Sequence, residues 1–573
     1  MEHTLTIPER KKRTYIAEDF DGSTLQNIEP YYNELLAREI NSLATLNKWL
    51  IDWNELDAVL GEQSRWTYVK TTVDTSDEVA KAALMNEYTV IFPTLTVLDN
   101  LLKKKFIASE FTALLDQNLF FTTLRKTKNA LALFREENIA LSSALQVKQS
   151  KYDEISGAQS IVYKGKEITM PQAAVYFEHT DRAVRQEVFE LLQTRKLQDS
   201  ETLDTLLTEL IQIRHQIALN AGFKNYLEYR FAELDRFDYT PEDCLQFHTS
   251  GEEVIMPIVN QLYLQRKHDL GLEVLKPWDK DVDTSGKEPL KPFENSDELI
   301  EKTIACFNKI DPYFAERIEI MREMKYLDLD SRMNKGAGGY NITMPEIGVP
   351  FIFMNSANSE SDVITMVHEG GHAIHTFLSH SLPLNIFKDT TSEIAEVASM
   401  GMELMSLEHW DVFYTDADDL NRAKKNHLEY ILSILTKTSL GDSFQFWLYL
   451  NPTHTVQERK NKWIELQGRF TTKHIDYTGY EEIQASGYQN ILHFYVVPFY
   501  YIEYAFAELG AIALWRNYKQ DSSKAVSDYK RALQLGYTGT IPVFYQTAGA
   551  KFDFSKAYIS SLVDFLKQEL DKL

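Results

Sequence analysis

The sequence has few cysteines, no long hydrophobic run and no excess of basic residues. Only Cys244 and Cys306 occur in 573 residues, and the first segment, MEHTLTIPERKKRTYI, lacks the apolar core of a secretory signal. A membrane-spanning helix needs roughly eighteen or more apolar residues in a row, and no such run is present. The formal net charge of -24 argues against a nucleic-acid or anionic-membrane surface, which needs a basic footprint. We therefore expect a cytoplasmic protein that binds neither nucleic acid nor membrane.

The composition that remains is that of a globular protein with a large core. Hydrophobic residues make up 44% of the chain, charged residues 25% and aromatic residues 12%. No low-complexity linker, internal repeat or heptad run separates domains. We divide the chain into an N-terminal helical region, residues 1–200, and a second region, residues 201–573, which can also form one continuous unit with the first.

Helical periodicity runs through most of the chain, and only short stretches depart from it. Amphipathic stripes over residues 181–192 and 201–223 predict helices. Apolar and polar residues alternate in SIVYKGKEITM, about Lys164-Gly165, which predicts a small β-hairpin. Residues 279–292 are polar and rich in helix breakers, and they predict an exposed loop. The pattern as a whole indicates a mainly α protein.

One short segment has the spacing of a metal site. His368, Glu369 and His372 form H-E-x-x-H inside residues 362–378, where apolar residues recur at helical spacing. On a helix, residues four apart lie one turn above each other, so the imidazoles of His368 and His372 can bind one zinc ion. Glu369 lies at the flank of that face, where its carboxylate can hold the attacking water and act as general base.

The residues around this motif support a helix that another segment approaches closely. Ser359 and Asp362 have capping-box spacing ahead of it, and Pro383 ends it. Gly370 and Gly371 together cost roughly 2 kcal/mol of helix propensity relative to alanine. A helix with two unrelated histidines would not need that cost, so we expect a close contact on the glycine face.

The segment GAGGYNITMPEIGVPFIFMN, directly before this helix, is poor in helix formers and predicts two short strands. An edge strand in this position lies near the metal and can pair with an extended peptide. A purely structural hairpin is the alternative.

A catalytic zinc site normally has three protein ligands and one open position. The downstream candidates are His375, His380, Glu393, Glu396 and Glu403. Three ligands in line on one helix cannot surround an ion, so we expect His375 to pack or hydrogen-bond. Thr390 and Glu393 have capping-box spacing, which gives Glu393 a structural role in the next helix. The residues alone leave Glu396 only slightly ahead of its neighbours.

A late segment, ILHFYVVPFYYIEYAF, is dense in hydrogen-bonding aromatic residues. Pro498 predicts the first turn of a helix, with His493 upstream in an extended or loop segment. Tyr500, Tyr501 and Tyr504 then fall on overlapping faces. Phenol and imidazole donors can stabilise the oxyanion that forms when an amide is cleaved. Aromatic stripes on helices also form ordinary cores, and that interpretation stays open.

HEGGHAIH followed by EIAEVASMGMEL closely resembles the zinc oligopeptidases of the thimet oligopeptidase and oligoendopeptidase F family. Their pattern is H-E-x-G-H-x-x-H, and a glutamate on the following helix, in an E-V-x-S-like context, is the third ligand. Glu396 stands at that position. Gly371 matches the family glycine, whereas Gly370 stands where a larger residue is usual. LDLDSRMNKGAGGY, YKGKEITMPQ and DRAVRQEVF resemble other parts of the family, and the similarity is greatest to the shorter oligoendopeptidase F branch, which includes Pz-peptidases.

The resemblance implies two helical halves around a deep channel, with a small β-sheet next to the helix that binds zinc. Residues 1–200 would form one wall or lid of the channel, and residues 201–573 the catalytic region. One zinc ion per chain, and no other cofactor, would be bound by His368, His372 and Glu396.

The same resemblance implies the remaining catalytic residues and the reaction. His493 and Tyr504 match the family's histidine and tyrosine that face the zinc, and Tyr500 and Tyr501 compete for one further place. The implied protein is an endopeptidase that cleaves internal bonds of short oligopeptides. A helical zinc carboxypeptidase and a non-catalytic peptide-binding relative are the alternatives, and the sequence predicts no oligomeric state.

Overall fold

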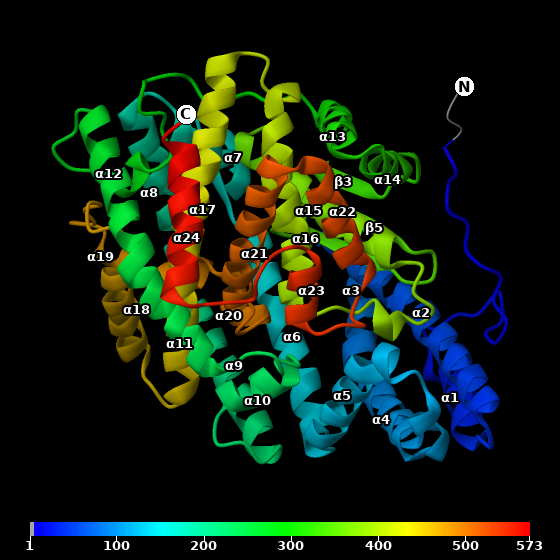
Figure 1. The fold of residues 1–573 in the computed structure, drawn as a ribbon. Helices are drawn as coiled ribbons and strands as arrows, with labels where there is room; N and C mark the ends of the chain where they lie inside the picture. Colours follow the sequence, from blue (N-terminus) through cyan, green and yellow to red (C-terminus); the bar gives the residue numbers. More distant parts are fainter. Residues whose placement is uncertain (1–4) are drawn as a thin grey trace.

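Helices carry most of the fold, as predicted (Figure 1). The computed structural model describes residues 5–573. The first helices, blue to cyan in Figure 1, are α1 (Leu25–Ala37), α2 (Leu43–Val73), α3 (Glu78–Asn86), α4 (Phe92–Ala108), α5 (Gln117–Leu133) and α6 (Glu137–Gly157). In the described part of the chain, no helix is both long and apolar enough to cross a membrane.

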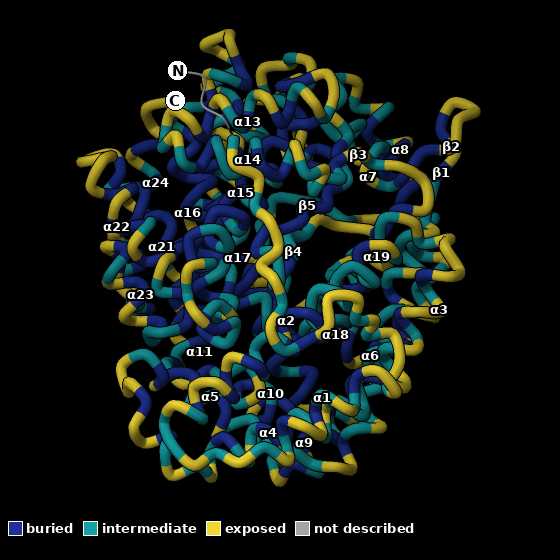
Figure 2. The backbone as a smooth tube through the Cα atoms, turned by 90° about the vertical axis from the view of Figure 1, so that its right-hand side faces the viewer, coloured by how far each residue is buried: buried dark blue, intermediate teal, exposed yellow. Residues whose placement is uncertain are grey.

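The remaining helices form the larger part of the molecule. In chain order, some come before a small three-stranded sheet and the others come after it. Those before the sheet are α7 (Met170–Ala174), α8 (Arg182–Gln198), α9 (Ser200–Asn220), α10 (Tyr226–Glu233), α11 (Pro241–Ser250), α12 (Met256–Asp269), α13 (Ser296–Ile310) and α14 (Pro312–Glu323). Those after it are α15 (Glu360–Ser379), α16 (Ser392–Ser406), α17 (Ala417–Leu450), α18 (Val456–Phe470), α19 (Glu481–Ala485), α20 (Leu492–Val496), α21 (Tyr501–Gln520), α22 (Ser522–Gln534), α23 (Ile541–Thr547) and α24 (Lys556–Leu570). Figure 2 shows that α16 and α21 run through the buried interior.

Two small sheets interrupt the helices. β1 (Ser160–Tyr163) and β2 (Lys166–Thr169) pair antiparallel, which confirms the predicted hairpin. Lys164 and Gly165 make the turn with positive φ angles of 50° and 77°. The second sheet has the order β3-β5-β4, formed by β3 (Leu327–Asp330), β4 (Tyr340–Met344) and β5 (Val349–Ser356).

The second sheet lies against α15, next to the H-E-x-x-H motif. The two predicted strands, β4 and β5, are antiparallel, and β3 joins β5 in parallel as a strand that the sequence did not predict. β4 is one of the two edge strands. The Nδ2 of Asn341 on β4 donates to the backbone carbonyl of Glu369, at 3.2 Å, so this edge reaches the motif.

The helix α15 packs directly on α16 at its glycines. The backbone N–H of Ser359 donates to the Asp362 carboxylate at 2.7 Å, which confirms the predicted capping box. A Cβ on Gly371 would lie 2.6 Å from the carbonyl oxygen of Ala398, and one on Gly370 would lie 2.7 Å from the ring of Phe307. The close contact expected from the two glycines is therefore present, with α16 on one side and α13 on the other.

Two local predictions need correction. The N-cap of α16 is Thr391, not Thr390, since the helix begins at Ser392. Residues 279–292 form a loop, but Val282 and Leu290 are buried, so the loop packs against its neighbours and is not fully exposed. The prediction rested on the polar composition of the loop and did not take these two apolar residues into account.

The tyrosine segment also starts differently from the prediction. Pro498 does not open the helix, because α21 begins three residues later, at Tyr501. Phe499 has a φ of 67°, a left-handed conformation that stops any helix at that point. His493 lies in the short helix α20 and not in an extended segment.

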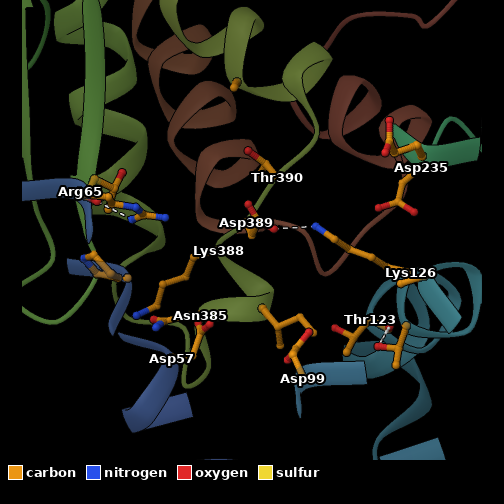
Figure 3. Close-up of a pocket in the computed structure, with 18 of the residues that line it drawn as sticks. Asp57, Arg65, Asp99, Thr123, Lys126, Asp235, Asn385, Lys388, Asp389 and Thr390 are labelled. Carbon is orange, nitrogen blue, oxygen red and sulfur yellow. Dashed lines mark hydrogen bonds and ion pairs between the residues drawn. The ribbon is translucent and has the colours of Figure 1, made fainter. Parts of the chain in front are cut away.

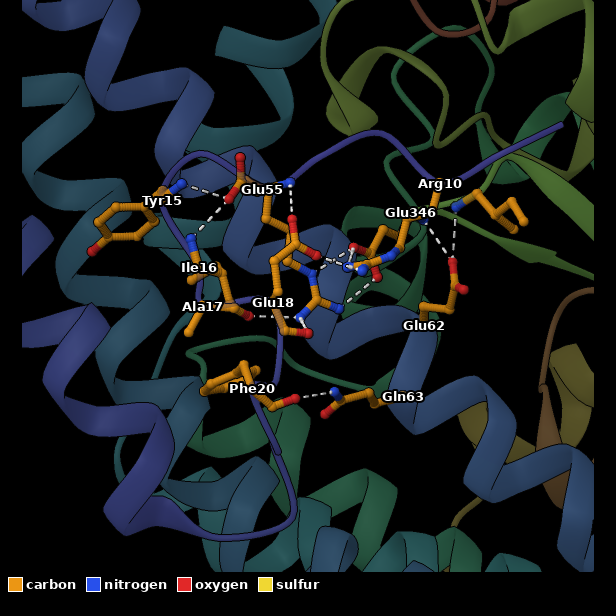
Figure 4. A network of polar contacts seen from close by, with 12 residues as sticks. Arg10, Tyr15, Ile16, Ala17, Glu18, Phe20, Glu55, Glu62, Gln63 and Glu346 are labelled. Atoms are coloured by element: carbon orange, nitrogen blue, oxygen red, sulfur yellow. Dashed lines mark hydrogen bonds and ion pairs between the residues drawn. The ribbon is translucent and has the colours of Figure 1, made fainter.

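The N-terminal segment ties the first helices to the sheet (Figure 4). Arg10 and Arg13 both form ion pairs with Glu346 in the β4–β5 turn, with N–O distances of 2.9 and 2.6 Å. Glu62 on α2 accepts the backbone N–H of Glu346 at 2.8 Å. Glu55, also on α2, accepts three backbone N–H groups of the N-terminal segment. The turn that follows edge strand β4 is thus held both by the N-terminal segment and by α2.

We expect Gly371→Ala to destabilise the fold. Overpacking of this kind costs about 1–3 kcal/mol, which exceeds the ~1 kcal/mol that alanine contributes to helix propensity. Gly468→Ala is the matched control, since Gly468 lies in α18 with nothing within 4 Å of the position that a methyl group would take, and that change should be neutral or stabilising. Urea unfolding midpoints measure both. A Gly371→Ala protein as stable as the wild type would contradict the tight α15–α16 contact.

Candidate active site

A cavity of about 1010 Å³ lies between the N-terminal helices and the α15, α16 and β4 elements. Its N-terminal wall includes Trp53 of α2 and Asn138 of α6. The opposite wall includes Asn341 of β4 and the H-E-x-x-H side chains. The cavity therefore joins segments from both helical regions of the chain.

The three candidate ligand side chains come together at this wall. The ligand atoms of His368, His372 and Glu396 all lie within 4.8 Å of one another. Glu396 Oε2 lies 3.3 Å from His368 Nε2 and 3.7 Å from His372 Nε2. The histidines are one turn apart on α15, and α16 brings the carboxylate because of its direct contact at Gly371. Two imidazoles and one carboxylate are a donor set that suits zinc and leaves a fourth position open.

The charge states of two of these groups suit a metal. In the third, burial would lower the pKa of His368, but its hydrogen bonds to Glu396 and Glu403 raise that pKa well above its usual value. Burial alone would raise the pKa of Glu396, but the imidazoles of His372 and His368 lower it to about 2. Burial lowers the pKa of His372 to about 4. At neutral pH Glu396 therefore offers an ionised carboxylate and His372 a neutral imidazole, which are the forms that bind a metal.

Glu369 is next to His368 on α15 but is not one of the three residues whose ligand atoms converge. Its side chain lines the cavity, and its Oε2 has no hydrogen-bond partner among residues 5–573. Burial raises the pKa of Glu369 to about 7, with smaller effects from neighbouring charges. A carboxyl group with a pKa near neutrality can both accept and return a proton.

The other ligand candidates have different surroundings. Glu403 Oε1 lies 2.5 Å from His368 Nδ1, on the side of the ring away from Nε2. Glu393 is buried and accepts a hydrogen bond from Tyr239, so it has a structural contact. His375 is buried against Phe544, in line with the packing role expected for it. His380, directly after the end of α15, lines the cavity without joining the ligand group.

The aromatic segment divides into residues that face the cavity and residues behind them. Tyr500 and Tyr504 line the cavity, and the Tyr500 hydroxyl donates to Glu396 Oε1. The hydroxyl of Tyr504 lies 3.1 Å from His493 Nε2, so His493 supports it from behind. Tyr501 points to α17, where its ring fills the space that a Cβ on Gly441 would need. The geometry thus separates Tyr500 from Tyr501, which the sequence did not.

The cavity also holds charged residues that sequence reasoning missed (Figure 3). Lys126 and Asp389 form an ion pair at 2.6 Å, and Arg65 donates to the backbone carbonyl of Thr343 on β4. Lys388 lines the cavity and has no ion-pair partner in the described part of the chain. These residues come from separate segments, and no local motif marks them.

The sequence matches two descriptions of one peptidase family. Residues 175–564 match peptidase family M3, and residues 19–134 match the peptidase M3 N-terminal domain. An oligoendopeptidase F homolog of Borreliella burgdorferi is 24% identical over 385 residues, which are 64% of this chain and 62% of the relative. One from Mycoplasma pneumoniae is 24% identical over 408 residues, 66% of this chain and 64% of the relative. These matches span a little under two thirds of the relatives' length.

Solved structures share the fold over nearly the whole chain. A structure of Pz peptidase A with an inhibitor has a TM-score of 0.92 at 23% identity, covering 97% of this chain and 99% of that one. A putative oligoendopeptidase F has a TM-score of 0.93 at 24% identity, covering 97% and 98%. The predicted helical architecture and the predicted family are both confirmed. Because the family match covers more than half of the sequence, this chain belongs to peptidase family M3.

Proposed function

We propose that the protein is a zinc-dependent endopeptidase that hydrolyses internal bonds of short oligopeptides. The observation that carries the proposal is the convergence of His368, His372 and Glu396 within 4.8 Å, at the wall of a cavity. Family membership and the oligoendopeptidase F relatives support the peptidase activity. The cavity lies between two walls, which favours short peptides over folded proteins.

In this proposal, His368 Nε2, His372 Nε2 and a Glu396 oxygen hold the zinc ion. Bound zinc supplies a Lewis acid that polarises the scissile carbonyl and activates water. Glu403 holds the Nδ1 side of His368, which fixes the ring and its tautomer. Tyr500 donates to the other oxygen of Glu396 and so orients that carboxylate.

The remaining groups act on the peptide itself. Glu369 takes a proton from the attacking water and returns it to the leaving amine, because its side chain lines the cavity and one of its oxygens has no hydrogen-bond partner. The Tyr504 hydroxyl, backed by His493, donates to the oxyanion that develops on the carbonyl, and Tyr500 helps to place that carbonyl. Edge strand β4 can pair with the extended substrate.

We also propose which role each region of the chain has and in which compartment the protein works. Residues 1–200 supply one wall of the channel and residues 201–573 the catalytic groups, in line with the lining of the cavity. The buried, unpaired thiols of Cys244 and Cys306 favour a reducing compartment such as the cytoplasm.

A carboxypeptidase is the second candidate, because Lys388 and Arg65 line the cavity and could bind a terminal carboxylate. Peptides of graded length, blocked at both ends, separate the two activities when the products are identified by mass spectrometry. We expect internal cuts in short peptides only. Cuts confined to unblocked C-termini would favour the carboxypeptidase, and no cuts by zinc-loaded protein would favour a peptide-binding relative.

In the same assay we expect Glu369→Gln to lower the rate by about 10²-fold to 10⁴-fold, because the amide cannot accept the proton. Glu369 is not one of the proposed ligands, so the variant should bind as much zinc as the wild type. Metal content by mass spectrometry is the control. A fully active Glu369→Gln enzyme would sink the assignment of the general base.

Glu403→Gln should weaken zinc binding about 10-fold to 100-fold, since a neutral amide orients His368 less firmly than a carboxylate does. Competition with a chelator measures the affinity. Glu408→Gln is the control, because Glu408 accepts from Trp515 at 2.9 Å and has no contact with the proposed ligands. Equal affinities of the two variants would count against the support of His368 by Glu403.

Tyr504→Phe should lower kcat by about 10²-fold to 10³-fold with a smaller change in KM, because it removes one oxyanion donor. Tyr501→Phe is the matched control and should leave both constants unchanged, since that ring packs against α17. Steady-state kinetics on one blocked peptide measures both. A larger loss for Tyr501→Phe would contradict the proposed roles.

A further inference from the structure

The segment of residues 494–499, which we call the tyrosine linker, connects His493 to Tyr500 and Tyr504. It includes the end of α20 and the turn before α21, so most of its carbonyl groups cannot bond within a helix. Phe494, Tyr495 and Phe499 are fully buried. A buried linker of this kind needs hydrogen-bond donors from elsewhere in the protein.

Side chains of other elements supply these donors. Arg214 of α9 donates to the carbonyls of Phe494, at 2.9 Å, and Tyr495. Arg230 of α10 donates to Pro498 at 3.2 Å, and Arg236 donates to Phe499. In addition, Gln149 of α6 donates to the carbonyl of Val496 at 2.7 Å, and the one remaining carbonyl, that of Val497, accepts the N–H of Tyr500. Three arginines therefore hold four of the six linker carbonyls.

Phe499 shows that the linker is held in a conformation it would not adopt alone. Its φ of 67° is an outlier for a bulky residue. Its N–H donates to Gln445 at 2.6 Å, and its ring packs 5.2 Å from that of Tyr449 and 5.9 Å from that of Phe446, between centroids. Such strain persists only where the surroundings determine the backbone, and it is common near active sites. Here the strained residue directly precedes Tyr500.

Arg214 has an unusual environment for a buried cation. Its side chain is 0% exposed, and its partners are the Tyr449 hydroxyl, at 2.8 Å, and two backbone carbonyls. Among residues 5–573 it has no ion pair with a carboxylate. A buried charge with only neutral partners is costly, so it is poorly explained by a contribution to fold stability. The planar guanidinium can bind several oxygens at fixed angles, which a lysine cannot do.

We propose that Arg214, Arg230 and Arg236 are positioning residues that hold the tyrosine linker so that Tyr500 and Tyr504 face the metal site. None of the three arginines lines the cavity, so they act through the tyrosines and do not touch substrate. Arg236 also pairs with Glu503 on α21 at 2.7 Å, which fixes the helix that carries Tyr504. This inference rests on the proposed role of the tyrosines in catalysis.

The first test is Arg214→Lys, which keeps the charge and removes the planar fork. We expect kcat to fall by about 10-fold to 100-fold, as expected for misplaced catalytic groups, with KM and zinc content nearly unchanged. The control is Arg185→Lys, at a buried arginine that also pairs with Asp279 at 2.9 Å. Arg185 is also buried and donates to backbone carbonyls, those of His179 and Trp278, in a region that does not line the cavity.

A double-mutant cycle separates positioning from a merely structural role. If Arg214 acts through Tyr504, then Arg214→Lys should cost much less in the Tyr504→Phe background than in the wild type. Equal costs in both backgrounds, or equal losses for Arg214→Lys and Arg185→Lys, would overturn the proposal. If Arg214→Lys does not fold, Arg230→Gln serves the same cycle, because the Arg230 side chain is partly exposed.

Hydrogen exchange provides a readout that does not depend on activity. In the metal-free protein, the backbone amides of residues 493–500, except that of Pro498, should exchange faster in Arg214→Lys than in the wild type, and Arg185→Lys should leave them unchanged. If exchange in Arg214→Lys is unchanged, the proposed role of the arginines in holding the tyrosine linker is wrong, even if the enzyme cleaves peptides. If the wild-type protein cleaves no peptide but exchange is faster in Arg214→Lys than in the wild type, the proposed function is refuted. The arginines would then still hold the tyrosine linker, as a purely structural contact.

Discussion

The contact between the backbones of α15 and α16 at Gly371 is the constraint on which the rest of the site depends. The two histidines of the motif lie on one helix and the carboxylate that meets them lies on the other, so the distance between the helix axes sets the size of the site. Only a residue without a side chain lets α15 approach the carbonyl of Ala398 this closely. Gly370 has the same role toward Phe307 of α13, which explains why a larger residue is absent there. Helix α15 therefore has low intrinsic helix propensity at the two positions where its packing requires glycine.

Behind this contact the site is supported by polar groups from distant parts of the chain. Glu403 contacts His368 and lies 3.6 Å from the buried ring of His427, and Tyr500 contacts Glu396. Arg214 holds the segment that carries the tyrosines. In a low-dielectric interior such hydrogen bonds are strong when complete and costly when broken. The arrangement of the proposed catalytic groups thus depends in part on α9 and α17, which supply none of these groups.

Local signals in the sequence predicted the parts of this structure that local physics determines. The spacing of His368 and His372 requires only a helix, and the turn at Lys164-Gly165 requires only a residue that tolerates positive φ. The choice of Glu396 over Glu403 needed the family resemblance, because both lie on α16 and both reach His368, from opposite sides of its ring. Tertiary contacts decided the rest. Phe499 adopts its left-handed conformation because Arg236 and Gln445 hold it, so α21 begins later than Pro498 indicated, and the charged residues of the cavity share no motif.

The N-terminal segment has a consequence for how the molecule is made. Arg13 pairs with Glu346, 333 residues further along the chain, and so helps to fix the turn that carries the edge strand. The proposed ligands follow this turn, and Tyr504 follows them. During synthesis, these groups are all present only after residue 504 has been added. We therefore expect the nascent protein to lack the complete proposed site until late in translation, so that neighbouring unfolded chains are not exposed to it before then.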